Sequence, residues 1–219
     1  MFVSAPAPDV IEVRPDERFD EARLAAWLAG KLPGSDRPLR VRQFGGGHAN
    51  LTYLLQYGDV EYVLRRPPLG PVAPGAHDME REHRVLSRLW RAFPLAPRAH
   101  LFCDEPTVLG APFFVMERRH GVVVRGGIPE AFGGGRDETA NRKLSQVVVD
   151  VLADFHAVDP AAAGLGDLGR PEGFLARQVK GWTGRWERSR VEPFALADEL
   201  QRWLLDNLPA SPPATLLHN

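Results

Sequence analysis

The pattern of apolar and polar positions changes about halfway along the chain. In the first half, short apolar runs interrupted by polar residues are typical of β-strands. They predict strands at residues 39–44, 51–57 and 61–66, and a hairpin formed by 107–110 and 112–118. In the second half, apolar residues recur at helical spacing. Strands first and helices afterwards predict an α+β fold.

Helical spacing also marks two segments of the first half, at 19–30 and 77–93. The long segment 138–159 is the strongest helix prediction of the second half, and two more helical patterns follow it. The apolar stripes of the predicted helices are Phe19, Leu24, Trp27 and Leu28; Met79, Leu86, Leu89, Trp90 and Phe93; Leu144, Val147, Val148, Val151, Leu152 and Phe155; Leu175, Val179, Trp182 and Trp186; and Leu196, Leu200, Trp203 and Leu204.

The same pattern suggests how the chain is organised. Residues 1–18 contain three prolines and are expected to form a loose arm. A change from strands to helices places a boundary near residues 117–121. We therefore expect an N-terminal lobe over 1–117 and a second, helical part over 118–219.

Composition narrows the class of protein. Of the 219 residues, 44% are hydrophobic and 25% charged, as in an ordinary globular protein, and the net charge is −1. No basic patch suggests nucleic acid, and no apolar run is long enough to span a bilayer. A signal-peptide pattern is not recognisable, and a single cysteine, Cys103, forms no intrachain disulfide. These features favour a cytoplasmic protein.

The stretch "FGGGHANLTYLL" is the first candidate for chemistry. A glycine turn between strands can bring backbone N–H groups close to phosphate oxygens. It is neither a Walker loop, which needs Gly-Lys-Ser/Thr, nor a dinucleotide fingerprint, because a strand rather than a helix follows. Taken alone, the stretch is more often a simple hairpin turn than a phosphate-binding loop.

A cation and a carboxylate form the second candidate. Arg65 ends an apolar strand, and Glu82 shares a helical face with Met79 and Leu86. A carboxylate on the buried side of a helix is costly unless a cation meets it, so an ion pair with Arg65, or with its neighbour Arg66, is expected. The competing carboxylate, Glu80, points about 100° away from Met79. A purely structural ion pair remains the alternative.

Two further candidates lie at strand ends. "FFVMERRHG" runs from an apolar strand into charge and glycine, as a connection between two lobes would, or as an ordinary strand end does. "LLHN" ends the chain with His218, and a lone histidine at such a place is more often structural than catalytic.

The order of these segments resembles the aminoglycoside phosphotransferase family of kinase-like enzymes. The segments are the glycine turn, "YVLRR", "HDMEREHRVLSRL", "PFFVME", "VLADFHAVD", "FLARQVKGWTGRWE" and "LLHN". The branch found in acyl-CoA dehydrogenase-associated kinases is the most similar, over about residues 40–219. The resemblance implies a protein-kinase-like fold, with a β-sheet lobe carrying one main helix and an incomplete helical C-terminal lobe.

The resemblance also implies roles for individual residues. Gly46, Gly47 and Asn50 would lie in the loop over the phosphates of ATP. Arg65 would take the place of the lysine that meets those phosphates, with Glu82 as its partner. Arginine can bind a phosphate bidentately, but its guanidinium group is bulkier than the ammonium group of lysine.

At the lobe connection, the resemblance implies a hinge made of Met116, Glu117 and Arg118, whose backbone would bind adenine. His218 and Asn219 would begin the catalytic loop. The catalytic base, a carboxylate, and the ligands of magnesium would follow Asn219, outside this chain. The chain is thus expected to be the front part of a longer enzyme, cut one residue short of its base and inactive by itself.

The expected function of the parent protein is ATP-dependent phosphate transfer to a hydroxyl group of a small molecule. The expected partners are therefore a nucleotide and an alcohol substrate, with self-association through the helical face of Leu144, Val148, Val151 and Phe155. The branch favours a hydroxyacyl or similar metabolic substrate over an antibiotic. The alternative is a non-catalytic, kinase-like module that binds a nucleotide or a protein.

Overall fold

The computed structural model describes residues 10–46, 50–70, 77–124 and 126–218. The chain divides into two compact units, residues 1–144 and 145–219, and each is described by itself. The division falls inside helix α4 (Glu138–His156). The lobe boundary expected between residues 117 and 118 stays a prediction.

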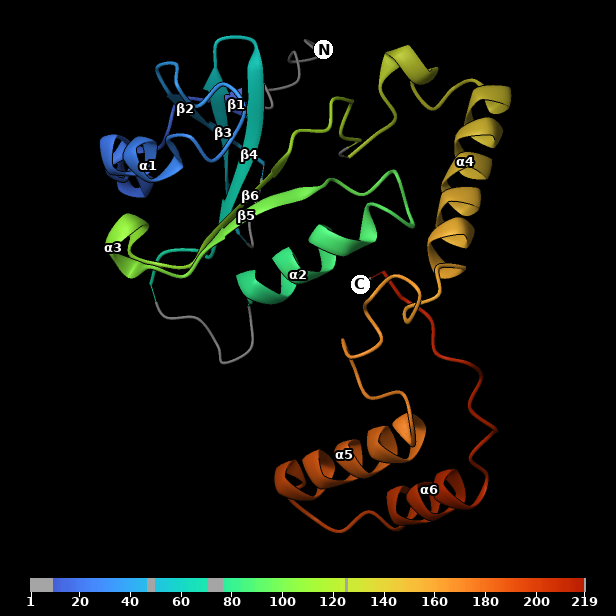
Figure 1. Cartoon of the computed structure of the whole chain (residues 1–219). Helices are drawn as coiled ribbons and strands as arrows, with labels where there is room; N and C mark the ends of the chain where they lie inside the picture. The colour runs from blue at the N-terminus through green and yellow to red at the C-terminus, as the bar shows by residue number, and fades with distance from the viewer. Residues whose placement is uncertain (1–9, 47–49, 71–76, 125, 219) are drawn as a thin grey trace. The chain divides into compact units, whose positions relative to one another are not determined.

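An antiparallel sheet forms the centre of the first unit (Figure 1). Its six strands lie in the order β1-β2-β3-β4-β6-β5. Gly58 adopts a positive φ of 63° in the turn between β3 and β4, where other residues would be strained. The strands are β1 (Val10–Ile11), β2 (Arg40–Phe44), β3 (Leu51–Tyr57), β4 (Val60–Arg66), β5 (Ala99–Cys103) and β6 (Phe113–Glu117).

Helices cover both faces of this sheet (Figure 1). Phe113 of β6 belongs to the larger core, which includes residues of α1 (Glu21–Leu28) and α3 (Pro106–Leu109). The next residue, Phe114, packs with Met79 of α2 (Met79–Leu89) on the opposite face. Successive strand residues point to opposite faces, so one short strand contributes to both cores.

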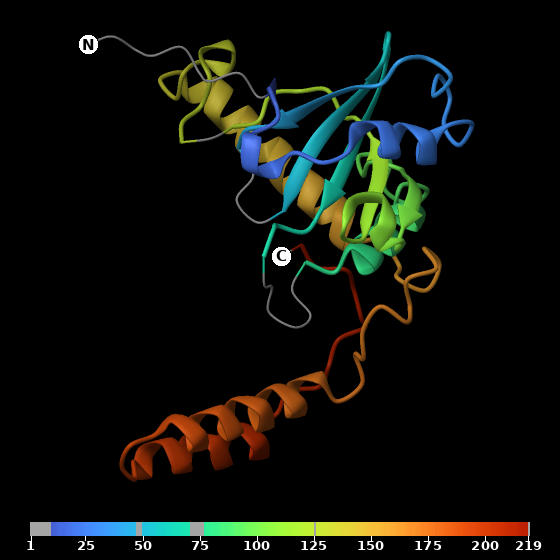
Figure 2. The same ribbon diagram turned by 90° about the vertical axis from the view of Figure 1, so that its left-hand side faces the viewer.

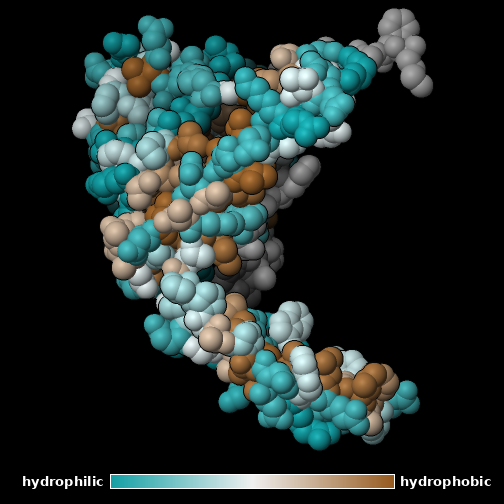
Figure 3. All heavy atoms as spheres, turned by 90° about the vertical axis from the view of Figure 1, so that its right-hand side faces the viewer, coloured by the Kyte–Doolittle hydropathy of each residue, from teal (hydrophilic) through white to brown (hydrophobic). Residues whose placement is uncertain are grey.

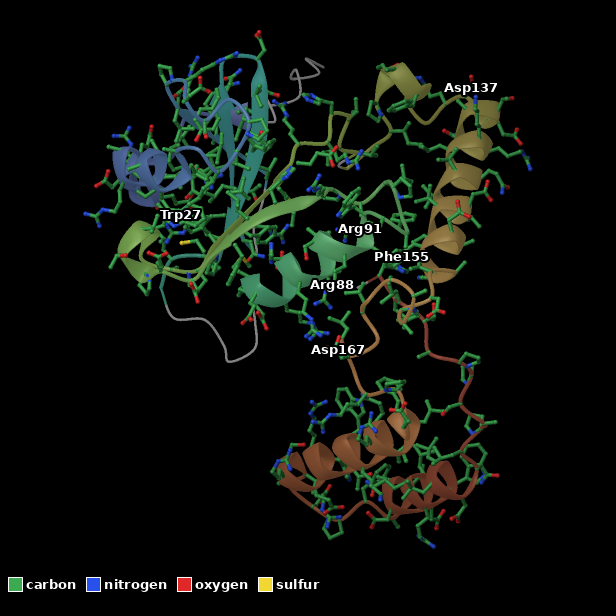
Figure 4. The ribbon with its side chains drawn as sticks, viewed as in Figure 1. Trp27, Arg88, Arg91, Asp137, Phe155 and Asp167 are labelled. Carbon is green, nitrogen blue, oxygen red and sulfur yellow. The ribbon has the colours of Figure 1, made fainter. Side chains whose placement is uncertain are left out.

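Helix α1 is anchored to the larger core by aromatic packing. Trp27 lies edge-on to Phe113, with ring centroids 5.2 Å apart (Figure 4). Asp20 caps the helix by accepting a hydrogen bond of 2.9 Å from the backbone N–H of Arg23. The single cysteine, Cys103, is buried in the same core, and burial raises the pKa of its thiol.

The second unit consists of helices and loops. Helices α5 (Phe174–Ser189) and α6 (Ala195–Asp206) lie side by side (Figure 2). Apolar side chains are exposed along this pair, as Figure 3 shows in its lower part. They include Trp182, Leu196, Leu200 and Trp203. No helix in the described parts of the chain is long and apolar enough to cross a membrane.

The structure confirms the α+β prediction but corrects two elements. Residues 107–110 are not a strand: Pro106 begins the short helix α3, and Gly110 ends it with a left-handed backbone. Strand β6 instead pairs with β4 and with β5, and the sequence pattern did not reveal β5. Part of the expected loose arm is also ordered, since residues 10–18 form β1 and a 3-10 turn, η1 (Pro15–Glu17). A second such turn, η2, spans Glu130–Phe132.

Candidate functional site

The predicted ion pair between Arg65 and Glu82 is present. Arg65 lies near the end of β4, beside Thr52 of β3 and Phe114 of β6. Glu82 lies in the first turn of α2, and its Oε2 atom is 2.9 Å from Nε of Arg65. The N–H direction does not meet the geometry of a hydrogen bond, so the contact is an ion pair by distance. Glu80, the competing carboxylate, is exposed on α2.

This pair is half-buried, with 34% of the Arg65 side chain and 32% of the Glu82 side chain exposed. Water screens such a contact, which typically adds about 1 kcal/mol or less to stability. Its main effect is therefore positional: it fixes a guanidinium group near the end of the central strand β4 without removing it from solvent.

Arg66, the other candidate cation, lies on the opposite face. Its side chain is only 5% exposed, and burial lowers the pKa of its guanidinium. Tyr53 lies nearby and donates a hydrogen bond of 2.8 Å from its hydroxyl to the carbonyl of Glu17. Burial, the largest cause, raises the pKa of Tyr53 to about 12, which is partly offset by the charge of Arg66.

Asn50, which follows the glycine turn, contacts the same carboxylate as Arg65. Its Nδ2 atom donates to Oε1 of Glu82 over 3.0 Å, and its Oδ1 atom is 2.6 Å from Nδ1 of His77. The Asn50 side chain is thus held by Glu82 of α2 and by His77, which directly precedes Asp78, the N-cap residue of that helix. His77 was not recognised from the sequence. A histidine before an N-cap aspartate gives no distinguishing signal there.

The described part of the glycine turn is supported by the N-terminal segment. Arg14 donates from Nη2 to the carbonyl of Gly45 over 2.9 Å, and its backbone N–H donates to Oε1 of Gln43 over 3.0 Å. Ile11 of β1 pairs with Gln43 of β2. Gly46 lies in the turn, whereas Gly47 lies outside the described residues.

The predicted hinge residues Met116, Glu117 and Arg118 lie at the end of β6. Met116 packs in the core under α2. The backbone N–H of Glu117 already donates to the carbonyl of Arg98 over 2.8 Å, and the Glu117 carboxylate accepts from the N–H of Arg98. Because the Glu117 N–H is used within the sheet, it is not free to bind a nucleobase.

Arg118 forms a second ion pair with a strand residue. Its Nη1 atom bonds to Oε2 of Glu61 on β4, and its guanidinium lies 6.0 Å from the ring centroid of Phe44. His120 places Nε2 3.6 Å from the same oxygen of Glu61. The side chain of Arg118 is thus tied to the sheet face that also carries Arg65.

His218 lies in the second unit, and its relation to Arg65 is therefore not defined. Its Nδ1 atom is 3.0 Å from Nε2 of His156, and the two rings stack with centroids 5.2 Å apart. Thr215 donates to the carbonyl of His156. Asn219 lies outside the described residues. Within those residues, no group of three or more His, Cys, Asp or Glu side chains could hold a metal ion.

The structure thus unites three of the predicted site residues, Asn50, Arg65 and Glu82, at one end of β4 and α2. The hinge residues lie on the neighbouring strand β6. Binding of a nucleotide by any of them stays a prediction.

Comparisons with known proteins agree with this arrangement. The profile of the phosphotransferase enzyme family matches residues 40–219. A crystal structure from Ralstonia eutropha JMP134, provisionally named an aminoglycoside phosphotransferase, superposes with a TM-score of 0.66 and 31% identity, over 88% of this chain and 54% of that one.

The curated relatives are named as acyl-CoA dehydrogenase family members rather than as phosphotransferases. Acyl-CoA dehydrogenase family member 11 of Gallus gallus is 35% identical over 92% of this chain and 26% of its own length. Acyl-CoA dehydrogenase family member 10 of Mus musculus is 29% identical over 96% of this chain and 20% of its own. The chain thus spans about a quarter of the length of these relatives.

The profile covers most of the chain, and the solved relative shares its fold. The fold is therefore kinase-like, and the branch expected from the sequence is confirmed by the acyl-CoA dehydrogenase family members. This chain belongs to the phosphotransferase enzyme family.

Proposed function

We propose that the chain supplies the nucleotide-binding part of an ATP-dependent phosphotransferase that acts on a hydroxyl group of a small molecule. The observation that carries this proposal is the ion pair of Arg65 and Glu82 beside the glycine turn. Phosphoryl transfer depends mostly on positioning and on charge placed against the phosphates, and a fixed, half-exposed guanidinium is suited to both.

The geometry around Arg65 fits a phosphate ligand. Glu82 approaches the Nε atom, on one edge of the guanidinium. The Nη groups, which point away from Nε in the planar fork, would then meet phosphate oxygens. Gly46, Gly47 and Asn50 would lie above those phosphates, and Met116, Glu117 and Arg118 beside the base. Because the Glu117 N–H is engaged, the base would bind to other backbone groups of this segment.

ATP, when bound, supplies the phosphoryl group. The residues near Arg65 fit its phosphates, whereas the described residues offer no cluster for the magnesium ion that usually accompanies it. We place the magnesium ligands and the catalytic carboxylate beyond His218 and Asn219, and we expect the acceptor to be a hydroxyacyl compound or a similar metabolite. We also propose that the protein acts in the cytoplasm and that this chain self-associates through α4.

Calorimetric titration of the chain with ATP tests the proposal. The wild-type chain should bind ATP, and Arg65→Gln should weaken binding by about tenfold or more, since a charge-assisted contact is lost. Arg40→Gln is the matched control, because Arg40 is an exposed arginine of β2 that pairs with Glu12. Absence of ATP binding, or equal losses in the two variants, would contradict the proposal. Binding of a protein instead would favour the non-catalytic module.

A further inference from the structure

Four side chains from separate segments form one connected network around the Glu82 carboxylate. Arg65 meets Oε2 at 2.9 Å, and Asn50 donates to Oε1 over 3.0 Å. His77 extends the network through its 2.6 Å contact with Asn50. We call these residues, Arg65, Glu82, Asn50 and His77, the Glu82 network. It connects the stem of the glycine turn, the end of β4 and the start of α2.

The chemistry of the carboxylate sets the direction of every hydrogen bond in this network. An ionised carboxylate accepts only, so the Asn50 amide must turn its Nδ2 group toward Glu82. Its Oδ1 atom then faces His77, and the contact needs a donor on the ring. His77 therefore carries a proton on Nδ1. The opposite orientation of the amide would place an acceptor against the carboxylate.

The backbone at His77 is held in an unusual conformation to make this contact. Its φ of 58° is the single positive value among the non-glycine residues in the described ranges. Non-glycine residues seldom adopt this conformation, because it is sterically unfavourable, although asparagine, aspartate and histidine do so more often than the others. Such a residue persists where its surroundings specify it and is often found at functional sites. Here the specific contact is the hydrogen bond to Asn50.

Asn50 also lies where its side chain can fix the start of β3 relative to α2. It is 7% exposed, directly follows the undescribed part of the glycine turn and directly precedes β3. Its amide has no freedom to turn toward a ligand without breaking its bonds to both Glu82 and His77. The amide therefore fixes the start of β3 relative to α2 rather than contacting phosphate directly.

We propose that Asn50 and His77 are positioning residues that hold the Glu82 carboxylate, and through it Arg65, so that phosphate binding at Arg65 depends on the hydrogen bonds of both. This inference rests on the proposed function. It departs from the role that the resemblance implies for Asn50, a residue of the loop over the phosphates, and adds His77, to which the sequence gave no role.

Substitutions at His77 separate positioning from backbone strain. His77→Gly keeps the left-handed backbone at no steric cost but removes the donor. His77→Asn also tolerates this backbone and can present an N–H near the position of Nδ1. His77→Asn should bind ATP as the wild type does, whereas His77→Gly should bind it about fivefold more weakly, the typical effect of one hydrogen bond. Adenosine, which has no phosphate, should bind all three proteins equally.

Each outcome of these titrations decides a separate point. Equal ATP affinity in His77→Gly and the wild type would overturn the coupling and leave the proposed function intact. An equal loss for ATP and adenosine, with a lower melting temperature, would show a structural role only and would also overturn it. A wild-type chain that binds no ATP would overturn both proposals. Long-range ¹⁵N spectra at about pH 8, where ordinary imidazole is neutral, should show His77 protonated on Nδ1, and protonation on Nε2 instead would exclude the network.

Discussion

Arg65 and Arg66 are consecutive residues of β4, yet their side chains lie on opposite faces of the sheet. Arg65 pairs with Glu82 of α2 and stays partly in solvent. Arg66 is buried on the face that carries Tyr53. One of two adjacent cations is thus available for a ligand, whereas the other belongs to the folded core.

This difference predicts that the same substitution changes the free energy of unfolding by different amounts at the two positions. Arg66→Gln should lower the free energy of unfolding by about 1–3 kcal/mol, because it shortens a buried side chain and leaves a polar group with less packing. Arg65→Gln should change it by less than about 1 kcal/mol, since the lost ion pair is screened by water. Urea unfolding of both variants, followed by circular dichroism, measures the difference. A larger loss in Arg65→Gln would contradict the assignment of the two faces.

Tyr53 predicts a loss of stability at alkaline pH. Its folded-state pKa of about 12 lies above the ordinary tyrosine value of 10.0, so its contribution is complete below about pH 10 and is lost as the pH rises toward 12. The loss should reach on the order of 2 kcal/mol. Urea unfolding between about pH 9 and 12 measures it.

Tyr53→Phe is the control for this titration. It removes the ionisable group and the hydrogen bond to Glu17, so the variant should be less stable by about 1 kcal/mol at neutral pH and less sensitive to alkali. An equally steep alkaline loss in the variant would assign the effect to other groups.

Helix α4 predicts self-association of the chain. Val148 belongs to the apolar stripe predicted from the sequence and is 51% exposed, while its neighbour Val149, outside the stripe, is 60% exposed. Apolar surface of this kind gains about 25 cal/mol for each Å² that association buries. Val148→Lys should therefore reduce association in light scattering more than Val149→Lys does. A wild-type chain that stays monomeric at high concentration would contradict the prediction.

The 219-residue chain is expected to transfer no phosphate to any acceptor. The resemblance places the catalytic carboxylate after Asn219, and phosphoryl transfer needs that group to accept the hydroxyl proton. Incubation with γ-labelled ATP and a panel of alcohols measures the transfer. Transfer above that of an Arg65→Ala control would show that the roles carried over from the family are misplaced.

The strands at the centre of the sheet could be predicted because they are short runs rich in aliphatic and aromatic residues and their turns contain glycine. The segment 107–110 could not, because four apolar or small residues fit a strand or a helical turn equally well. Pro106 at the first position and the left-handed Gly110 at the end decide in favour of the helix. The missed strand β5 has no alternation, since it is partly buried on both faces.

The ion pair of Arg65 and Glu82 was predictable from the sequence, whereas the contacts of His77 and of the Glu117 N–H were not. Arg65 and Glu82 are charges on apolar elements, and burial without a partner would be costly. The contact of His77 with Asn50 accompanies a positive-φ backbone that non-glycine residues seldom adopt and that the sequence does not indicate. The use of the Glu117 N–H within the sheet depends on strand pairing, which the sequence does not show.

The hydrogen bond from Arg14 to Gly45 joins the glycine turn to a segment that the family profile does not include. The family profile begins at residue 40, but Arg14 and Ile11 hold the beginning of the glycine turn from outside it. Relatives with a different N-terminal segment would support their turn in another way or leave it less restrained. Nucleotide affinity would then depend in part on residues 10–18, which the family profile does not include, and chimaeras that exchange only this segment would transfer that contribution.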